Sequence, residues 1–192
     1  MAAQCNGKII NYSNIGRDVG TSDKTVKEYF ALLEDTLLGK IIEPFHHSFR
    51  KRLKTAPKFY FFDVGVVRAL SLMLNVPLKE RTSYFGELFE SFIVMECFKL
   101  ASYYHPDYRF SYLMTADGAE IDLVVERPAQ PLLFIEIKSS TQVQAIELNN
   151  LREIANEFNH CEAICLSNDP RPRKMDQVII YPWQEGIKKF FT

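Results

Sequence analysis

The chain has 192 residues, a formal net charge of −1 and 47% hydrophobic residues, with 15 Phe and 9 Tyr among them. This length fits one large or two small domains with an ample apolar core. The near-neutral charge gives no general support for nucleic-acid binding and leaves only a local basic patch for that role. The four cysteines lack CxxC spacing, and neither a secretory signal nor a bilayer-spanning apolar run is visible. We therefore expect a soluble, cytoplasmic protein with reduced thiols.

The first third of the chain predicts a small helical unit. Residues 12–20 favour a short helix that ends at Gly20, because glycine commonly terminates helices. Thr21 or Ser22 can then cap a second helix, which should run to about Leu38. Two helices joined by such a tight turn are typical of a helix-turn-helix.

Two short strands are expected at residues 40–45 and 58–62, on either side of a basic segment. Together with the two helices they predict a winged helix-turn-helix domain over residues 1–74, in which residues 21–27 open the recognition helix. The alternative is a helical packing unit with solvated charges, or a protein-binding module, since such folds serve both roles. The candidate DNA contacts are Thr21, Ser22, Lys24, Lys27, Arg50, Lys51, Arg52 and Lys54.

A second domain is expected over residues 75–192. It follows a predicted helix at residues 63–74, and the polar connection at 75–81 is the best candidate for the boundary. A long amphipathic helix should then run from residue 83 to about residue 104, with Glu90 among its apolar side chains. An isolated carboxylate at that position would be costly to bury unless it met a cation or hydrogen-bond donors.

The stretch from Ala119 to Lys138 predicts a β-hairpin in which odd positions within the strands are apolar and even positions carry the charges. One face should therefore be buried and the other charged. A loop centred on Ala129 sets Asp122 opposite Glu136 and Glu120 opposite Lys138. The opposed carboxylates of Asp122 and Glu136 beside a lysine make a poor structural pair but a good cation site. We expect Glu120 to neutralise the charge of Lys138.

The remaining segments complete an α/β pattern. A strand at residues 108–114 should precede the hairpin, and a helix should follow it to about residue 158. Further strands are expected at 161–166 and 177–181, with a final helix at 182–191 that has proline at its start. This order predicts an α/β sandwich with a mixed sheet flanked by helices.

The second domain resembles the PD-(D/E)XK restriction-endonuclease-like superfamily, whose pattern is matched by Glu90, Asp122 and Glu136-Ile137-Lys138. The phrases GELFESFIVMECFKL, GAEIDLVV and FIEIKSS are similar to a large prokaryotic family of AAA-type ATPases with a winged helix and a C-terminal nuclease-like domain of unassigned function. KFYFFDVGVVRAL and YPWQEGI also resemble that family, so the resemblance covers nearly the whole chain. It implies the C-terminal part of such a protein, because no GxxxxGK[ST] phosphate loop occurs.

The chemistry expected of these residues is metal-dependent phosphodiester hydrolysis. Mg²⁺ prefers a few carboxylates plus waters, polarises a phosphoryl oxygen and lowers the pKa of a bound water. Asp122, Glu136 and the backbone carbonyl of Ile137 are the candidate ligands for Mg²⁺ or Mn²⁺, with Glu90 as a further ligand or a contact through water. Lys138 would orient the attacking water or stabilise developing negative charge.

Two functions follow as hypotheses. The first is the C-terminal portion of an AAA-type ATPase family protein that binds DNA and cleaves it as a Mg²⁺-dependent nuclease. The second is a non-catalytic module that binds DNA or a protein and regulates an associated ATPase, which the missing phosphate loop and the near-neutral charge favour. A third, purely structural alternative is that the acidic residues of the candidate site are solvated surface charges. A membrane is not an expected partner.

Overall fold

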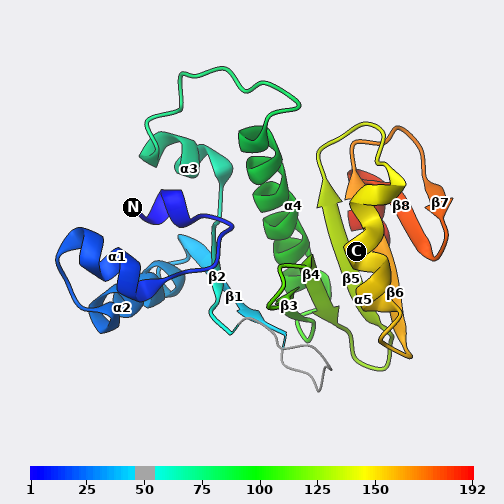
Figure 1. Cartoon of the computed structure of the whole chain (residues 1–192), viewed down its shortest axis with the longest axis horizontal. Helices are drawn as coiled ribbons and strands as arrows, with labels where there is room; N and C mark the ends of the chain where they lie inside the picture. Colours follow the sequence, from blue (N-terminus) through cyan, green and yellow to red (C-terminus); the bar gives the residue numbers. More distant parts are fainter. Residues whose placement is uncertain (46–54) are drawn as a thin grey trace. The chain divides into compact units, whose positions relative to one another are not determined.

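The computed structural model describes residues 1–45 and 55–192, which divide into two compact units (Figure 1). Unit 1 contains Met1–Glu43 and Thr55–Leu78, and unit 2 contains Pro44, Phe45 and Lys79–Thr192. Four of the predicted DNA contacts lie outside the described residues, namely Arg50, Lys51, Arg52 and Lys54.

The two helices predicted for unit 1 are confirmed, with the expected glycine stop and serine cap, although the second ends at Asp35 and not near Leu38. Helix α1 (Tyr12–Val19) ends at Gly20, whose φ of 72° lies in the left-handed region that glycine adopts without strain. Ser22 caps helix α2 (Asp23–Asp35), because its hydroxyl accepts a hydrogen bond of 3.1 Å from the Thr25 amide.

A two-stranded antiparallel sheet follows the helices, at the place predicted for the wing. Strand β1 (Gly39–Pro44) pairs with strand β2 (Lys58–Phe61). Gly39 permits this pairing, since a Cβ there would lie 2.3 Å from the ring of Phe59 and 2.5 Å from the carbonyl oxygen of Tyr60.

Two short helices and an aromatic core complete unit 1. The 3₁₀ helix η1 (Ala2–Cys5) precedes α1, and helix α3 (Val64–Leu70) follows β2. The rings of Phe30 and Phe59 pack edge to face with centroids 5.2 Å apart. Helix α3 is shorter than the predicted helix at residues 63–74, and it begins directly after Asp63, which caps it.

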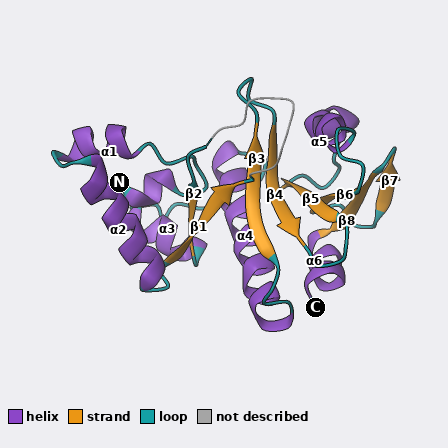
Figure 2. Cartoon of the chain, turned by 90° about the horizontal axis from the view of Figure 1, so that it is seen from below, coloured by secondary structure: helices purple, strands orange, loops and turns teal. Residues whose placement is uncertain are grey.

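Unit 2 contains a mixed sheet in which strands β3 to β8 lie side by side in the order β3-β4-β5-β6-β8-β7 (Figure 2). Strands β3, β4 and β5 are antiparallel neighbours, β6 and β8 run parallel to β5, and β7 is antiparallel to β8. The predicted mixed α/β class is confirmed, although β7 was not predicted. The bounds are β3 (Arg109–Met114), β4 (Glu120–Glu126), β5 (Leu132–Lys138), β6 (Cys161–Ser167), β7 (Arg173–Met175) and β8 (Val178–Pro182).

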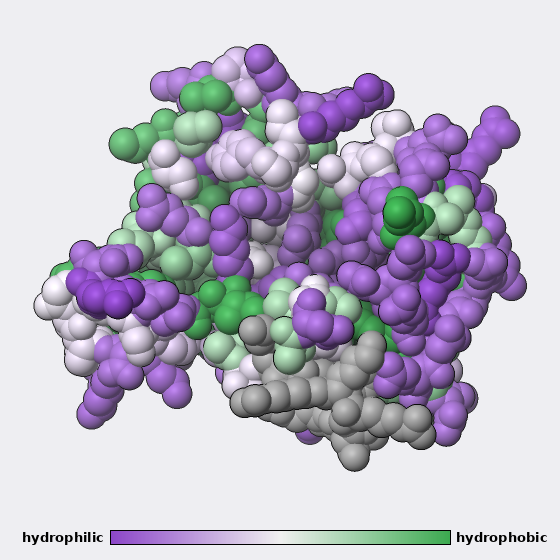
Figure 3. Space-filling model, viewed as in Figure 1, coloured by the Kyte–Doolittle hydropathy of each residue, from purple (hydrophilic) through white to green (hydrophobic). Residues whose placement is uncertain are grey.

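Helices cover both faces of this sheet (Figure 2). On one face, α4 (Ser83–Tyr104) and α6 (Trp183–Phe191) pack against each other. The other face is covered by the 3₁₀ helix η2 (Ala145–Leu148) and α5 (Asn149–Ala155). The single helix predicted to about residue 158 is therefore wrong in its length and continuity. The surface seen over α5 is mostly hydrophilic (Figure 3), as expected for a helix with one buried face.

The hairpin of β4 and β5 is buried on both faces, which corrects the prediction of one charged face. Odd-numbered Leu123 and Ile135 are fully buried, and so are even-numbered Val124 and Phe134. Val124 and Phe134 belong to the same apolar cluster as Leu151 of α5. Helices cover both faces of this sheet, and the charged Asp122 and Glu136 are themselves buried.

Helix α4 has the bounds that the sequence predicted. Thr82 caps it, accepting a hydrogen bond of 3.2 Å from the amide of Phe85. It has 22 residues, yet no helix in the described part of the chain is long and apolar enough to cross a membrane. The four cysteines are free thiols, in line with the expectation from their spacing.

Candidate functional site

Strand β4 contains a β-bulge at the position of Asp122. Across the pair of β3 and β4, Ser111 lies opposite Val124, whereas Leu113 lies opposite Ile121. Strand β4 thus has one more residue than β3 between these two pairs. Ile121 and Val124 both belong to one apolar cluster, although residues three apart on a regular strand point to opposite faces. The regular alternation of side chains is therefore interrupted between them, where Asp122 lies. Bulges commonly redirect a side chain beside a functional site.

The predicted hairpin register is confirmed where β4 and β5 pair. Leu123 lies opposite Ile135, which is the register centred on Ala129, and Ala129 has the left-handed φ of 57° that a tight loop needs. The pairing ends there. Beyond it, the Oδ2 atom of Asp122 accepts a hydrogen bond of 2.7 Å from the backbone amide of Ile137. The Asp122 carboxylate is therefore held against β5.

Glu136 is buried, with 7% of its surface exposed. Its Oε1 atom accepts a hydrogen bond of 2.5 Å from Nζ of Lys138, while its Oε2 atom is buried without a hydrogen-bond partner among the described residues. Burial raises the pKa of Glu136 well above its usual value, and the charge of Asp122 adds to this against the opposing effect of Lys138. Glu136 therefore offers a buried oxygen to which a cation can bind.

Lys138 remains protonated in this setting. Burial lowers its pKa, but the charges of Glu136 and Asp122 and the hydrogen bond to Glu136 outweigh that effect and raise the pKa above its usual value. The expectation that Glu120 neutralises Lys138 is wrong, because the ion pair of Lys138 is made with Glu136. Residues two apart on a strand share a face, so the lysine at the end of β5 can fold back onto Glu136.

Glu90 lies half-buried on α4, the helix that packs against β5. A Cβ on Gly86, one turn earlier, would lie 3.7 Å from Oγ of Ser139, so this part of α4 is beside the end of β5. No three His, Cys, Asp or Glu side chains in the described ranges form a group that could hold a metal ion. The structure therefore brings Asp122 and Glu136 together, with Lys138 beside them, and does not join Glu90 to them as a third acidic ligand.

Cys165 is a site neighbour that the sequence reasoning missed. It lies opposite Glu136 in the parallel register of β5 and β6, and it is fully buried. Burial raises the pKa of its thiol, and the charge of Glu136 raises it further. Cys165 is therefore an uncharged neighbour of Glu136. The pairing of two strands separated by a helix has no local sequence signal that could have revealed it.

The predicted DNA contacts of unit 1 that the structure describes surround the start of α2. Lys24 and Lys27 are exposed, and Thr21 is half-buried. Ser22 is engaged as the helix cap. The exposed carboxylate of Asp23 lies in the same helical turn, so the start of α2 is not uniformly basic.

The fold and the site define a mixed α/β protein with a buried carboxylate pair and a lysine at the end of two neighbouring strands. Over residues 85–185 the chain matches the family described as a domain of unknown function (DUF4143), and it belongs to that family. Residues 1–80 match a second family description, also a domain of unknown function (DUF8612).

Relatives with detectable identity include the uncharacterized proteins Mb2031c of Mycobacterium bovis and Rv2008c of Mycobacterium tuberculosis. Each is 28% identical over 141 residues, a stretch that covers 73% of this chain and 31% of the relative. The chain thus spans about a third of the length of these relatives. A solved structure with some similarity is the refined half-complex from the tetradecameric assembly of Thermococcus gammatolerans McrB AAA+ hexamers with bound McrC. Its TM-score is 0.40 at 11% identity, covering 85% of this chain and 64% of that chain.

Proposed function

We propose that unit 2 is a metal-dependent phosphodiesterase domain of the restriction-endonuclease-like kind that cleaves DNA, and that unit 1 is a winged helix that helps to bind the DNA. The observation that carries the proposal is the buried pair of Asp122 and Glu136, with the Oε2 atom of Glu136 left without a hydrogen-bond partner among the described residues. A buried carboxylate oxygen is costly unless it meets donors or a cation. A divalent cation would offset that cost.

The residues present fit Mg²⁺ or Mn²⁺. These hard cations are commonly held by one or two carboxylates and several waters, which does not require a third acidic side chain. Asp122 and Glu136 would hold the ion, with the backbone carbonyl of Ile137 as a further candidate. When bound, such an ion polarises the phosphoryl oxygen and lowers the pKa of a bound water.

The role of Lys138 follows from its charge. Because its pKa is raised, its ammonium group stays protonated at neutral pH and cannot accept a proton from water. It can instead donate hydrogen bonds to a phosphate and stabilise the negative charge that develops during hydrolysis. Glu136 positions this ammonium group through its Oε1 atom, at 2.5 Å. Of the two roles expected for Lys138, charge stabilisation is the one that we propose.

We further propose that the chain acts within, or together with, an AAA-type ATPase. Support comes from the resemblance of its sequence phrases to that ATPase family and from the greater length of its relatives, of which it matches 31%. A second candidate function is a non-catalytic DNA- or protein-binding module that regulates such an ATPase. It is favoured by one observation, that the described residues hold no group of three metal-binding side chains.

Cleavage of DNA tests the proposal. The purified chain is incubated with linear, branched and single-stranded DNA in Mg²⁺, in Mn²⁺ and in EDTA. We expect cleavage with either metal, none in EDTA, and a loss of at least ~100-fold in Asp122→Asn. Glu126→Gln is the control, since Glu126 is exposed at the other end of β4 and should not affect the rate. Equal cleavage by Asp122→Asn and the parent would show that the site lies elsewhere.

A further inference from the structure

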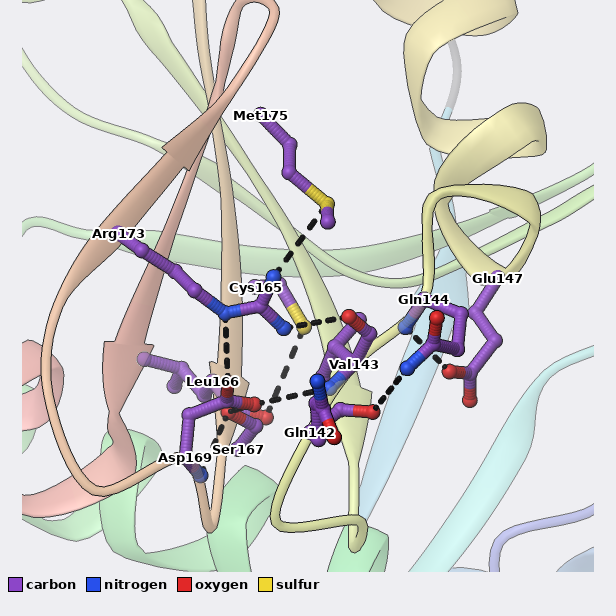
Figure 4. A network of polar contacts seen from close by, with 10 residues as sticks. All are labelled: Gln142, Val143, Gln144, Glu147, Cys165, Leu166, Ser167, Asp169, Arg173 and Met175. Atoms are coloured by element: carbon purple, nitrogen blue, oxygen red, sulfur yellow. Dashed lines mark hydrogen bonds and ion pairs between the residues drawn. The ribbon is translucent and has the colours of Figure 1, made fainter.

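The loops that follow β5 and β6 are tied together by a buried polar network (Figure 4). Asp169, only 4% exposed, accepts hydrogen bonds from the Val143 amide at 3.1 Å, from Oγ of Ser167 at 2.9 Å and from Nε of Arg173 at 2.7 Å. Arg173 also donates to the carbonyl oxygen of Val143. One buried carboxylate therefore fixes the position of both loops.

Asn168 makes a second link between the same loops, closer to the candidate site. Its backbone amide donates to the carbonyl of Ser140 at 3.1 Å, and its side-chain amide donates to the carbonyl of Ser139 at 3.0 Å. Ser139 directly follows Lys138. The linked loops thus begin at the candidate site, at the carboxyl ends of two parallel strands, where ligands of open α/β sheets commonly bind.

Two polar cavities share Thr141 and Gln142 of this linked region. The first, of about 390 Å³, also has Glu80, Arg81 and Ser140 in its lining. The second, of about 380 Å³, has Asp169, Arg171 and Arg173 in its lining. Because the loops are fixed by Asp169 and Asn168, a ligand would meet walls that are already ordered, which reduces the entropy lost on binding.

Each cavity has in its lining one arginine that forms no ion pair with a described residue. Arg81 and Arg171 are exposed and make no hydrogen bond or ion pair through their side chains with any residue that the structure describes. Arg173, by contrast, is paired with Asp169. The first cavity also holds Oγ of Ser140, a buried hydroxyl without a partner in the described part of the chain, and one acid, Glu80.

We propose that these two cavities form a phosphate strip, in which Arg81 and Arg171 bind successive backbone phosphates of the DNA strand whose scissile phosphate lies at Lys138. This inference rests on the proposed function and adds the path of the substrate to it. Guanidinium groups match phosphate oxygens in geometry and charge, and Ser140 supplies a further donor. The strip contacts no bases, so the binding that it provides is independent of sequence.

Binding without cleavage tests the strip. Fluorescence anisotropy in EDTA is measured with labelled single-stranded DNA, duplex DNA and RNA of one sequence, over a range of salt concentrations. The double variant Arg81→Gln, Arg171→Gln should bind DNA about 10-fold more weakly, with a salt slope lower by roughly 2. Glu80→Gln should tighten binding, because it removes the acid from the first cavity. Stronger binding of the RNA than of either DNA would overturn the assignment of the substrate as DNA.

A matched control is Arg109→Gln. Arg109 is exposed and lies opposite Glu126, at the end of the sheet remote from Lys138, so its loss should leave the affinity unchanged. Thermal unfolding of the double variant and of the two single variants checks that they remain folded, which we expect because neither arginine pairs with a residue in the described part of the chain. Parental affinity and salt slope in the double variant would overturn the strip.

The strip and the proposed nuclease can fail separately. Cleavage by the parent together with unchanged binding and cleavage in the double variant would refute the strip and leave the nuclease standing. Binding that depends on Arg81 and Arg171, without cleavage in any metal, would support the strip and refute catalysis. A parent chain that binds neither DNA nor RNA at low salt would overturn the strip.

Discussion

Replacing Asp169 by Asn should destabilise unit 2. The carboxylate accepts two hydrogen bonds from uncharged donors, worth about 1 kcal/mol each, and one from Arg173, worth about 1.5–3 kcal/mol. Asparagine keeps one acceptor oxygen but presents an amide to the remaining donors and leaves Arg173 without its acid. We therefore expect a loss of about 3 kcal/mol, or about 6–12 °C in Tm for a chain of this size.

The assay is urea unfolding followed by tryptophan fluorescence. Trp183, the single tryptophan of the chain, lies in α6 and packs against Phe92 of α4 with ring centroids 5.3 Å apart, so it reports on unit 2. The urea midpoint should fall with little change in slope. Asp107→Asn, at an exposed position, is the control and should change stability by less than about 0.5 kcal/mol.

The pH dependence gives the same prediction an independent check. Burial alone would raise the pKa of Asp169, but hydrogen bonds from Arg173, Val143 and Ser167 and the charge of Arg173 lower it below its usual value. A folded pKa below the unfolded one means that the stabilisation is present at neutral pH and is lost as pH falls through the folded pKa. The difference between the parent and Asp169→Asn should therefore shrink in acid. A variant as stable as the parent at pH 7, or a gap independent of pH, would refute the reasoning.

Two further predictions concern the site and the packing of helices. Lys138→Met should lower the rate of DNA cleavage by about 100-fold while changing DNA affinity in EDTA by less than about 3-fold. The reason is that the ammonium group acts on charge that develops in the transition state. Equal losses in rate and affinity would contradict this role. Gly186→Ala should destabilise unit 2 by about 1–3 kcal/mol in urea unfolding, since its Cβ would lie 2.3 Å from Cδ2 of Leu166. Gly86→Ala is the matched helical control and should be neutral or stabilising by about 0.5–1 kcal/mol, because its Cβ would meet only Oγ of Ser139 at 3.7 Å.

Features set by local chemistry could be predicted from the sequence. The bounds of α4 follow from its cap at Thr82 and its apolar spacing, and the hairpin register follows from a loop centred on Ala129. The approach of Asp122 to β5 was also predictable, because register and alternation are local properties of two strands.

Features set by distant contacts could not be predicted. The bulge at Asp122 depends on β3, and the burial of Val124 and Phe134 depends on α5, which is far along the chain. Alternation alone predicts one solvated face, whereas a sheet covered by helices on both sides has none. The pairing of Lys138 with Glu136 depends on a choice of side-chain conformation that the strand pattern does not encode.

The Asp169 network was missed for a similar reason. Its members come from the loops after β5 and β6 and from the short strand β7, which has only three residues. The contacts between Asp169, Val143 and Arg173 span up to 30 positions, and no motif spacing joins them. Only the parallel pairing of β5 and β6 brings the two loops to the same end of the sheet.

Binding of Mn²⁺ to the carboxylate pair is the most direct test of the central claim, and titration calorimetry with a parallel thermal-unfolding series measures it. The parent should bind one ion and gain about 2.7 kcal/mol of stability at a free Mn²⁺ concentration 100 times Kd. Asp122→Asn and Glu136→Gln should each lose this gain, whereas Glu126→Gln should keep it. No heat and no stabilisation of the parent at millimolar Mn²⁺, or an equal gain in all variants, would contradict the assignment of Asp122 and Glu136 as a cation site.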